Sequence, residues 1–351
     1  MKKILMTWVV AVFAVLQAQA QSSVIALLSH EGNVTTFNGA TALQKAHEAA
    51  VNGDVITLSS GTFHSVDITK GVTVRGAGML PDTLMGTEPT VVSGDFTFNM
   101  AEAGDDAATS FEGIQFNNDK MVAAYANNVT FNKCILHTLT YEDYYGNSTM
   151  NNLSFIHCRI WGELSIGNNG NAICRNCFVS NPRSYNESSS NFEFTNCVIY
   201  TSAANKLYTS ILNNCVFIDG VYAGYTGDSY RLPGTNTVSY TLASAFTDKN
   251  GVYPLANSTT STSWTFAQAD VSSIFKTYTG TYDNYETFEL TESAAATYIG
   301  SDGTQVGMYG GSTPYTATPS VSGLQVTKFQ VAPKSDSEGR LSIDIEVKTA
   351  E

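Results

Sequence analysis

Aromatic and acidic residues gather in the middle of the chain, in a pattern suited to contact with sugars. One group lies in the segment Tyr141–Asn147, and later segments add smaller groups. Tyrosine and tryptophan rings cover the faces of sugars, and carboxylates accept hydrogen bonds from their hydroxyl groups. The pattern predicts a carbohydrate-binding surface that comprises Tyr141, Glu142, Tyr144, Tyr145, Trp161, Tyr185 and Tyr208. The alternative is that these tyrosines reflect the strand propensity of aromatic residues.

Cleavage of a sugar polymer would require more than such a surface. Hydrolysis uses two carboxyl groups about 5 to 9.5 Å apart, and Glu142 or Asp143 could be paired with Glu163 or Glu187. Elimination from a uronate needs a base and stabilisation of the enolate, often by Ca²⁺, and Arg183 is the local candidate. The candidate catalytic residues are therefore Glu163, Arg183, Glu187 and Asp143, with Ca²⁺ considered only for a lyase. Solvated turn residues also explain the same acids and arginine.

Two further motifs give no support for a metal or a nucleotide. Cys174 and Cys177 have the spacing of a zinc pair, but the chain contains no second pair and no His-x-His partner. Gly76-Ala-Gly78 follows an expected strand, but Pro81 comes next instead of a helix, and the third glycine is missing. No metal site and no dinucleotide site are therefore expected.

The composition predicts a folded chain rich in β-structure. Apolar residues make up 43% of the 351 residues, which is enough for a buried core. Charged residues make up only 14%, against about 25% in an average globular protein, and Ser, Thr, Asn and Tyr are abundant. The formal net charge of −13 at pH 7 opposes contact with a phosphate backbone, so no nucleic-acid partner is expected.

The first twenty residues have the features of an export signal. Lys2 and Lys3 precede the apolar stretch Ile4–Leu16, and Ala18-Gln-Ala20 supplies the small residues that precede a cleavage site. The apolar stretch is too short for a helix that crosses a bilayer core of about 30 Å. We expect residues 1–20 to be a signal peptide and the mature chain to be secreted, with no transmembrane segment.

A short phrase repeats through the middle of the chain. Its copies end 20, 24, 19, 20 and 18 residues apart, at Ile114, Cys134, Cys158, Cys177, Cys197 and Cys215. Three residues before each of these stands a second position, occupied by Phe111, Phe131, Phe155, Cys174, Phe194 and Leu212. A period of about 20 residues is typical of a solenoid, in which these positions would form two apolar columns.

Each repeat predicts two short strands joined by a polar bend. The bend positions are Gly113, Lys133, His157, Asn176, Asn196 and Asn214. Asparagine tolerates the left-handed backbone angles that such a bend needs. The segments between the copies lack the 3.6-residue apolar period of a helix, so parallel coils stacked about 4.8 Å apart are expected. The aligned cysteines are expected to be free and packed in the core, with disulfides as the alternative.

The regions on either side of the repeats differ from them. Thr41-Ala-Leu-Gln44 fits the capping box of one short helix. The expected apolar stripe of this helix is Leu43, Ala46, Ala50 and Val51. Leu324–Val331 and Leu341–Val347 alternate with a period of two, which predicts a terminal hairpin. We expect one β-helix domain over residues 21–315 and a C-terminal β-hairpin segment over residues 316–351.

The order of these segments carries a family resemblance. The helix is followed by Gly53–Phe63, by Val66–Gly78 and by the Phe/Asn/Cys coils, and over about residues 38–220 the chain resembles the secreted parallel β-helices of the pectin lyase-like superfamily. Ser301–Gly311 resembles a segment that closes β-helix proteins exported by polysaccharide-using Gram-negative bacteria. The resemblance implies an all-β, right-handed parallel β-helix (solenoid) with an N-terminal capping helix, in the periplasm, at the cell surface or outside a bacterium.

The resemblance is specific to the fold, because the catalytic motifs of the family are incomplete. Gly104-Asp-Asp106 matches one of the four parts of the polygalacturonase pattern, and the Arg-x-Pro-x-x-Arg signature of pectate lyases is absent. Our hypothesis is an exported β-helix protein that binds a carbohydrate polymer along its lateral face. Polysaccharide lyase or glycoside hydrolase activity stays open, and the alternative is a non-catalytic adhesive or structural cell-surface protein.

Overall fold

The computed structural model describes most of the repeat region and both of its flanks. The described residues are 24–82, 86–104, 106–117, 121–141, 150–167, 169–184, 190–201, 207–219, 236–245, 247–248, 251–252, 266, 269–278, 286–316, 324–331 and 343–349. The predicted signal peptide, residues 1–20, lies outside them.

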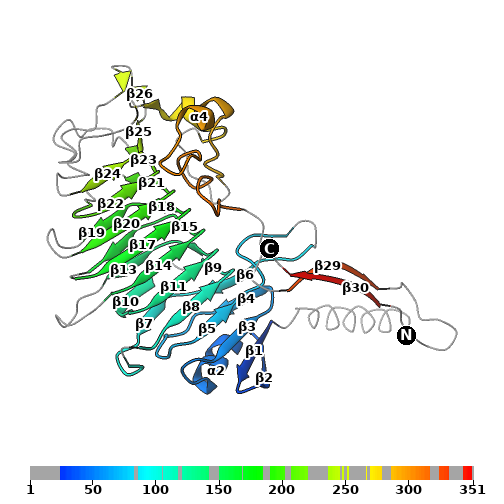
Figure 1. The fold of residues 1–351 in the computed structure, drawn as a ribbon. Coiled ribbons are helices and arrows are strands. Elements are labelled where there is room, and N and C mark those ends of the chain that lie inside the picture. The colour runs from blue at the N-terminus through cyan, green and yellow to red at the C-terminus, as the bar shows by residue number, and fades with distance from the viewer. Residues whose placement is uncertain are drawn as a thin grey trace, which may run out of the picture.

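Short strands wind into a parallel β-solenoid with three sheets, which confirms the all-β solenoid predicted from the repeats (Figure 1). Within the described residues, sheet A runs in the order β2 (Asn33–Asn38), β1 (Ile25–His30), β3 (Val55–Leu58), β5 (Thr73–Arg75), β8 (Thr109–Glu112), β11 (Val129–Asn132), β14 (Leu153–Ile156), β17 (Asn171–Arg175), β20 (Asn191–Thr195), β22 (Ile211–Asn213) and β24 (Thr237–Ser239). Its strands pair in parallel, except that β1 is antiparallel to β2 and β3.

The other two sheets are parallel throughout their described strands. Sheet B runs in the order β28 (Ala269–Asp270), β25 (Leu242–Ala245), β23 (Val216–Asp219), β21 (Val198–Thr201), β18 (Phe178–Ser180), β15 (Arg159–Ile160), β12 (Ile135–Leu136), β9 (Gln115–Asn117), β6 (Thr90–Ser93) and β4 (Gly61–His64). Sheet C runs in the order β19 (Pro182–Ser184), β16 (Leu164–Ile166), β13 (Leu139–Tyr141), β10 (Met121–Tyr125) and β7 (Phe96–Asn99). One coil therefore passes from sheet A to sheet B to sheet C and then returns to sheet A.

Two hairpins and three helices complete the described elements. One hairpin joins β26 (Thr247–Asp248) to β27 (Gly251–Val252). The other joins β29 (Leu324–Val331) to β30 (Ile343–Thr349) and is the terminal hairpin predicted from the period-two alternation. The helices are α2 (Ala42–Ala49), α3 (Val271–Ile274) and α4 (Glu292–Thr297). In the described part of the chain, no helix is long and apolar enough to span a membrane.

The first apolar column is present as predicted. Successive strands of sheet A place in register Phe111, Phe131, Phe155, Cys174, Phe194 and Leu212. The ring centroid of Phe131 lies 5.2 Å from that of Phe111 and 5.2 Å from that of Phe155. These side chains are buried because strand alternation turns every second residue inward. Each coil therefore covers its apolar groups only where a neighbouring coil lies on it.

The second column consists of free cysteine thiols that form hydrogen bonds with backbone carbonyls. All six cysteines are buried and unbridged, which confirms the prediction of free, packed cysteines. Each repeat cysteine donates to the carbonyl two residues before it, at 3.1 to 3.3 Å, and lies 3.2 to 3.6 Å from a carbonyl of the preceding coil. Burial raises the pKa of the Cys134, Cys177 and Cys215 thiols. These thiols therefore stay protonated and act as small core groups.

Left-handed residues form the corner between sheets A and B. The predicted bend positions Gly113, Lys133, His157, Asn176, Asn196 and Asn214 all have φ between 49° and 66°. Each of these residues also donates its backbone N–H to a carbonyl of the next coil, at 2.9 to 3.2 Å. The bend therefore turns the chain without interrupting the hydrogen bonds that join the coils.

Helix α2 forms where the sequence predicts it, but its ends differ from the prediction. It lies beside β1–β4 at the N-terminal end of the solenoid (Figure 1). The capping box is absent, because the amide of Gln44 donates to the carbonyl of Ser65 at 2.9 Å and Thr41 makes no side-chain cap bond. Val51 lies beyond the end of the helix and is 50% exposed, so its place in the apolar stripe was wrong.

The outer face of sheet B is buried as well, which the sequence did not predict. Its outward row consists of Ile135, Arg159, Phe178, Val198, Val216 and Leu242, in register and at most 4% exposed. Residues from 269–278 and 286–316 cover this row and form a second apolar core with it. For example, the rings of Phe288 and Phe178 stack with their centroids 4.1 Å apart. The solenoid therefore has one core inside the coil and another outside it.

Residues 286–316, which we call the C-terminal strap, run back along the corner between sheets A and B. Asn214 and Asn196 donate to a carboxylate oxygen of Asp302 at 3.0 and 3.4 Å. Asn176 donates to two strap carbonyls at 2.7 and 3.0 Å, and Nε2 of His157 lies 2.8 Å from a third. The segment that resembles a closing element therefore lies along the side of the solenoid, where the left-handed asparagines bind it.

Removal of one ring from the first column should destabilise the fold. We expect Phe131→Ala to lower the free energy of unfolding by about 3–5 kcal/mol, because the cavity lies between two rings that cannot close over it. Thr130→Ala is the matched control, since this neighbouring side chain points outward from the same strand, and its cost should be about 0.5 kcal/mol. Urea unfolding followed by circular dichroism measures both, and equal losses would contradict the assignment of inward and outward faces.

The asparagine contacts to the strap should be measurable one at a time. Asn176→Gly keeps the left-handed backbone but leaves two buried strap carbonyls without their donor, which should cost about 1–3 kcal/mol and speed amide hydrogen exchange at Met308–Gly310. Asn152→Gly is the control, because Asn152 is also left-handed, with φ of 57°, but its side chain bonds to Asn128 at an exposed corner. If Asn176→Gly leaves the amide hydrogen exchange of Met308–Gly310 unchanged, the proposed attachment of the strap by Asn176 is wrong.

Candidate functional site

Five of the eleven candidate residues lie in the described part of the chain. They are Tyr141, Trp161, Glu163, Arg183 and Tyr208. The other six, which lie outside the described residues, are Glu142, Asp143, Tyr144, Tyr145, Tyr185 and Glu187. The surroundings of the first five show which of them can meet a ligand.

Glu163 and Arg183 come together on the outside of sheet C. Arg183 is the middle residue of β19, and its neighbours Pro182 and Ser184 are buried, so alternation directs the guanidinium outward. Glu163 directly precedes β16, the strand that pairs with β19. Its carboxylate Oε1 lies 3.9 Å from Nη1 of Arg183, and the side chains are 31% and 46% exposed. The pair therefore places a carboxylate and a guanidinium group at a partly exposed surface.

Tyr208 belongs to the coil that follows Arg183. Its backbone N–H lies 3.4 Å from the hydroxyl of Ser184, the last residue of β19. The side chain of Tyr208 is half-buried, while the preceding Leu207 is in the core. Glu163, Arg183 and Tyr208 therefore come from three consecutive coils. Glu163 and Arg183 are paired on the outside of sheet C, and the role of the three residues in binding stays a prediction.

Tyr141 is a core residue, which corrects its assignment to the surface. It is 8% exposed and belongs to the main apolar core. In β13 the side chains alternate, with Leu139 and Tyr141 inward and Thr140 outward. Its ring lies so close to Gly167 that a side chain there would overlap it. The sequence pattern placed Tyr141 in a surface group because the strand boundary was not visible in it.

Trp161 is also largely taken up by packing. Its ring centroid lies 4.7 Å from that of Phe178 and 6.1 Å from that of Phe288, which belongs to the C-terminal strap. Its indole nitrogen is shielded from solvent. Trp161 therefore belongs to the second core, on sheet B, and does not share the flank of Glu163 and Arg183. Trp161 is covered because the strap packs on it. Phe288 of the strap is more than 120 residues away in the sequence, so no local sequence pattern reveals this contact.

An ion pair between a partly exposed histidine and a buried aspartate, which the sequence did not single out, lies near the N-terminal end. Nδ1 of His30 lies 2.7 Å from Oδ1 of Asp54, and the other Asp54 oxygen accepts a hydrogen bond from the backbone of Val51 at 2.8 Å. The hydrogen bond and charge of Asp54 raise the pKa of His30. Desolvation opposes ionisation of Asp54, but hydrogen bonds from Val51 and His30 outweigh it and lower the pKa of that carboxyl.

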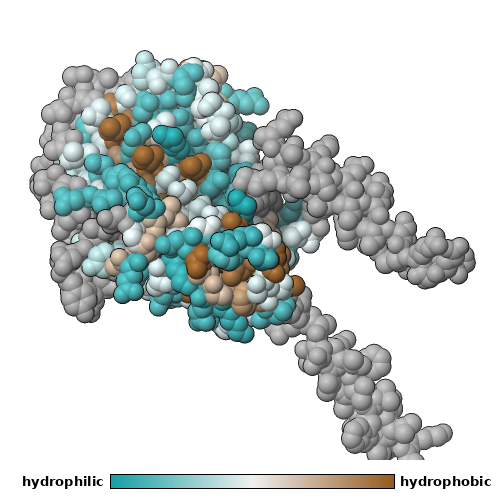
Figure 2. Space-filling view, turned by 60° about the horizontal axis from the view of Figure 1, so that its bottom comes forward, coloured by the Kyte–Doolittle hydropathy of each residue, from teal (hydrophilic) through white to brown (hydrophobic). Residues whose placement is uncertain are grey.

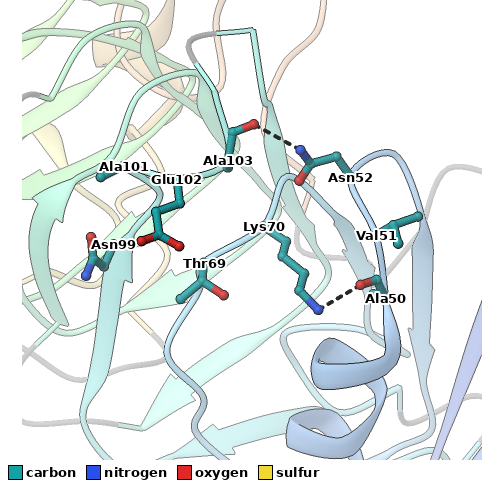
Figure 3. A pocket seen from close by; sticks show the side chains of 9 residues that line it. All are labelled: Ala50, Val51, Asn52, Thr69, Lys70, Asn99, Ala101, Glu102 and Ala103. Atoms are coloured by element: carbon teal, nitrogen blue, oxygen red, sulfur yellow. Dashed lines mark hydrogen bonds between the residues drawn. The ribbon is translucent and has the colours of Figure 1, made fainter.

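One cleft lies beside α2, away from the predicted flank. It has a volume of about 720 Å³ and is lined by Ala50, Val51, Asn52, Thr69, Lys70, Asn99, Ala101, Glu102 and Ala103 (Figure 3). A second cleft of about 490 Å³ shares Thr69 and Lys70 with it. The lining comes from three separate stretches of chain, so the sequence carries no contiguous signal for it.

The described surface exposes few large hydrophobic side chains. Figure 2 shows a face in which hydrophobic residues form small groups between hydrophilic ones. Among the described residues, the large hydrophobic side chains that are exposed are Ile25, Leu27, Val34, Val51, Ile211, Tyr240 and Ile299. No group of three or more His, Cys, Asp or Glu side chains in the described ranges is placed to hold a metal ion. The described surface is therefore better suited to a hydrated, polar ligand than to an apolar one.

Comparison of the chain with models of protein families, with curated proteins and with solved structures found no match. The class of protein is therefore defined by the fold, and the chain is a parallel β-solenoid.

The His30–Asp54 pair should make stability depend on pH. The raised pKa of His30 stabilises the fold below about pH 6.5, and this is lost as the pH rises through the folded-state value. The lowered pKa of Asp54 stabilises it above about pH 4, and this is lost as the pH falls. We expect His30→Gln to lower the thermal midpoint more at pH 5.5 than at pH 8.5. His64→Gln, at an exposed position of β4, is the control, and equal effects of His30→Gln at both pH values would refute the coupling.

Proposed function

We propose that this chain is an exported β-helix protein that binds a carbohydrate polymer along the flank of sheet C. The observation that carries the proposal is the pairing of Glu163 with Arg183 on consecutive coils of sheet C, with Tyr208 on the coil that follows. The proposal includes right-handed winding, membership of the pectin lyase-like superfamily, capping by α2, and secretion to the periplasm, the cell surface or the outside of a bacterium. The N-terminal export signal and the segment order support these parts of it.

The chemistry of the flank suits hydroxyl groups. The carboxylate of Glu163 accepts hydrogen bonds, the guanidinium of Arg183 donates them, and Tyr208 offers a ring face with a polar end. Because coils repeat about every 4.8 Å, a solenoid presents side chains in a line, as a polymer presents its sugar units. The acidic chain would repel a strongly anionic polymer, so a neutral or weakly charged glycan fits best.

Binding is better supported than cleavage. In the described part of this flank, Glu163 is the carboxylate beside Arg183, whereas hydrolysis needs a second carboxyl group at a set distance. Polysaccharide lyase or hydrolase activity is therefore a second hypothesis, with Arg183 and Glu163 as the groups to change. The charged pair of Glu163 and Arg183, both partly exposed, favours a glycan over the alternative of an adhesive protein that binds another protein through an apolar patch.

Affinity electrophoresis tests the proposal directly. The mature chain from residue 21 is run through gels that contain single plant or host polysaccharides. We expect at least one polymer to retard it, and Glu163→Gln and Tyr208→Ala each to weaken that retention about tenfold, as the loss of a charged hydrogen bond or a ring contact predicts. Glu193→Gln is the matched control, because Glu193 is a half-buried glutamate on the outward face of sheet A.

The same samples separate the competing functions. Release of reducing ends or unsaturated products that Glu163→Gln or Arg183→Ala abolishes would establish cleavage in place of simple binding. If no polymer retards the chain, or if Glu193→Gln weakens retention as much as Glu163→Gln does, the sheet C flank is not a glycan site. Association with cells or matrix in the absence of retention would support the adhesive alternative.

A further inference from the structure

The cleft beside α2 is formed where three stretches of chain meet (Figure 3). They are the exit of α2 at Ala50–Asn52, the Thr69–Lys70 turn, and the end of β7 with the turn that follows it, Asn99–Ala103. Its volume of about 720 Å³ lies within the range of about 300–1,000 Å³ that is usual for small-molecule sites. It is separate from the Glu163–Arg183 pair, since β7 and β19 are at opposite edges of sheet C.

Two polar residues of the cleft are committed to holding its walls together. Nζ of Lys70 donates to the carbonyls of His47, Glu48 and Ala50 at 3.0, 2.7 and 2.7 Å, which uses all three protons of the ammonium group. Asn52 accepts from the backbone N–H of Gly71 at 2.8 Å and donates to the carbonyl of Ala103 at 3.0 Å (Figure 3). These bonds pin the helix exit to the two turns, so the cleft is preformed.

Three other polar side chains are available to a ligand. Within the described part of the chain, the hydroxyl of Thr69, the amide of Asn99 and the carboxylate of Glu102 make no hydrogen bond or ion pair. Figure 3 shows that they lie along the same side of the cleft. They are exposed, which a purely structural role does not require. Thr69 and Asn99 can donate and accept, whereas Glu102 when ionised only accepts.

A buried histidine lines the adjoining cleft. His47 lines it and is 3% exposed, and its Nε2 is buried without a hydrogen-bond partner among the described residues. Burial, followed by the charge of Lys70, lowers the pKa of His47 to about 4, so the imidazole is neutral at pH 7. A buried polar atom without a partner costs free energy that a polar ligand or water would recover.

The lining selects against several classes of ligand. An anion would meet Glu102, with Glu48 and Asp67 in the adjoining cleft, and an ammonium group with no proton left to donate. A flat aromatic ligand would find no ring to stack on, because the nine lining residues of the larger cleft include none. Any cation would be repelled by the charge of Lys70, and an organic ammonium group would offer donors alone. Hydroxyl groups both donate and accept, and the small Ala50, Ala101 and Ala103 leave room for a ring.

We infer that the cleft beside α2 binds a single neutral sugar unit through Thr69, Asn99 and Glu102. This site is distinct from the proposed polymer-binding flank and does not depend on it. It lies at the first described strand of sheet C, where a chain end or a free monosaccharide can enter from solvent.

Saturation-transfer difference NMR of the full chain tests this inference, with D-glucose, D-galactose, D-mannose and N-acetyl-D-glucosamine as separate probes. At least one probe should bind, and Glu102→Gln and Asn99→Ala should each weaken it about tenfold, as the loss of a hydrogen bond to a charged or polar group predicts. Both positions are exposed, so the variants should fold, which circular dichroism checks. Glu31→Gln is the matched control, because Glu31 is also an exposed glutamate outside the cleft.

The outcomes separate this site from the polymer-binding flank. Arg183→Ala should leave monosaccharide binding unchanged, and Glu102→Gln should leave retention by polysaccharides unchanged, so either site can fail alone. The inference is wrong if none of the four probes binds, or if binding is the same in Glu102→Gln and in the unaltered chain. The inference would also be overturned, in favour of a cation site, if titration with calcium chloride showed binding that Glu102→Gln abolishes and no sugar gave a signal.

Discussion

A single coil of this solenoid carries too few apolar side chains to bury them alone, and it relies on equivalent side chains in the coils on either side. This constraint accounts for most of the architecture. The phenylalanine column, the cysteine column and the left-handed bends lie directly over their counterparts because parallel strands pair in register. The cysteines suit their position because a small side chain with a weak donor fits beside the bend and bonds to nearby carbonyls. The stack therefore fixes which side chains remain outside.

Those outward side chains are not equivalent on the three sheets. Sheet B has an apolar outer row, and the C-terminal strap and the residues before it cover that row. Asparagines at the corner bind the strap through amide groups that a bend alone would leave free. The covering of sheet B removes one lateral face from contact with ligands and draws Trp161 into packing. The Glu163–Arg183 pair on sheet C keeps its exposure because the strap follows a different corner.

The described clefts and flanks share a chemical character that bears on function. Their polar groups are mainly carboxylates, amides and hydroxyls, with the guanidinium of Arg183 on the flank. The ammonium group of Lys70 in the cleft is saturated by the carbonyls at the end of α2. Such surfaces exchange hydrogen bonds with water readily, so a ligand has to match their donors and acceptors closely to displace it. Hydroxylated ligands do so without the cost of burying an unpaired charge. The two proposed sites rest on this common chemistry but use different residues and opposite edges of sheet C.

Much of the fold could be predicted from the sequence because its main features repeat. Position in the 20-residue phrase determined that Phe131, Cys158 and Asn176 would be a core ring, a buried thiol and a bend, and each repeat is an independent sample of the same pattern. The position of the candidate residues was predictable only in part: Glu163 and Arg183 pair on the outside of sheet C, whereas Tyr141 points inward and Trp161 packs against the strap. Tertiary structure alone decided which lateral face is covered and where Thr69, Asn99 and Glu102 meet. These outcomes depend on single contacts between segments that are distant in the sequence. Because each contact occurs only once, it produces no repeating sequence pattern from which it could be predicted.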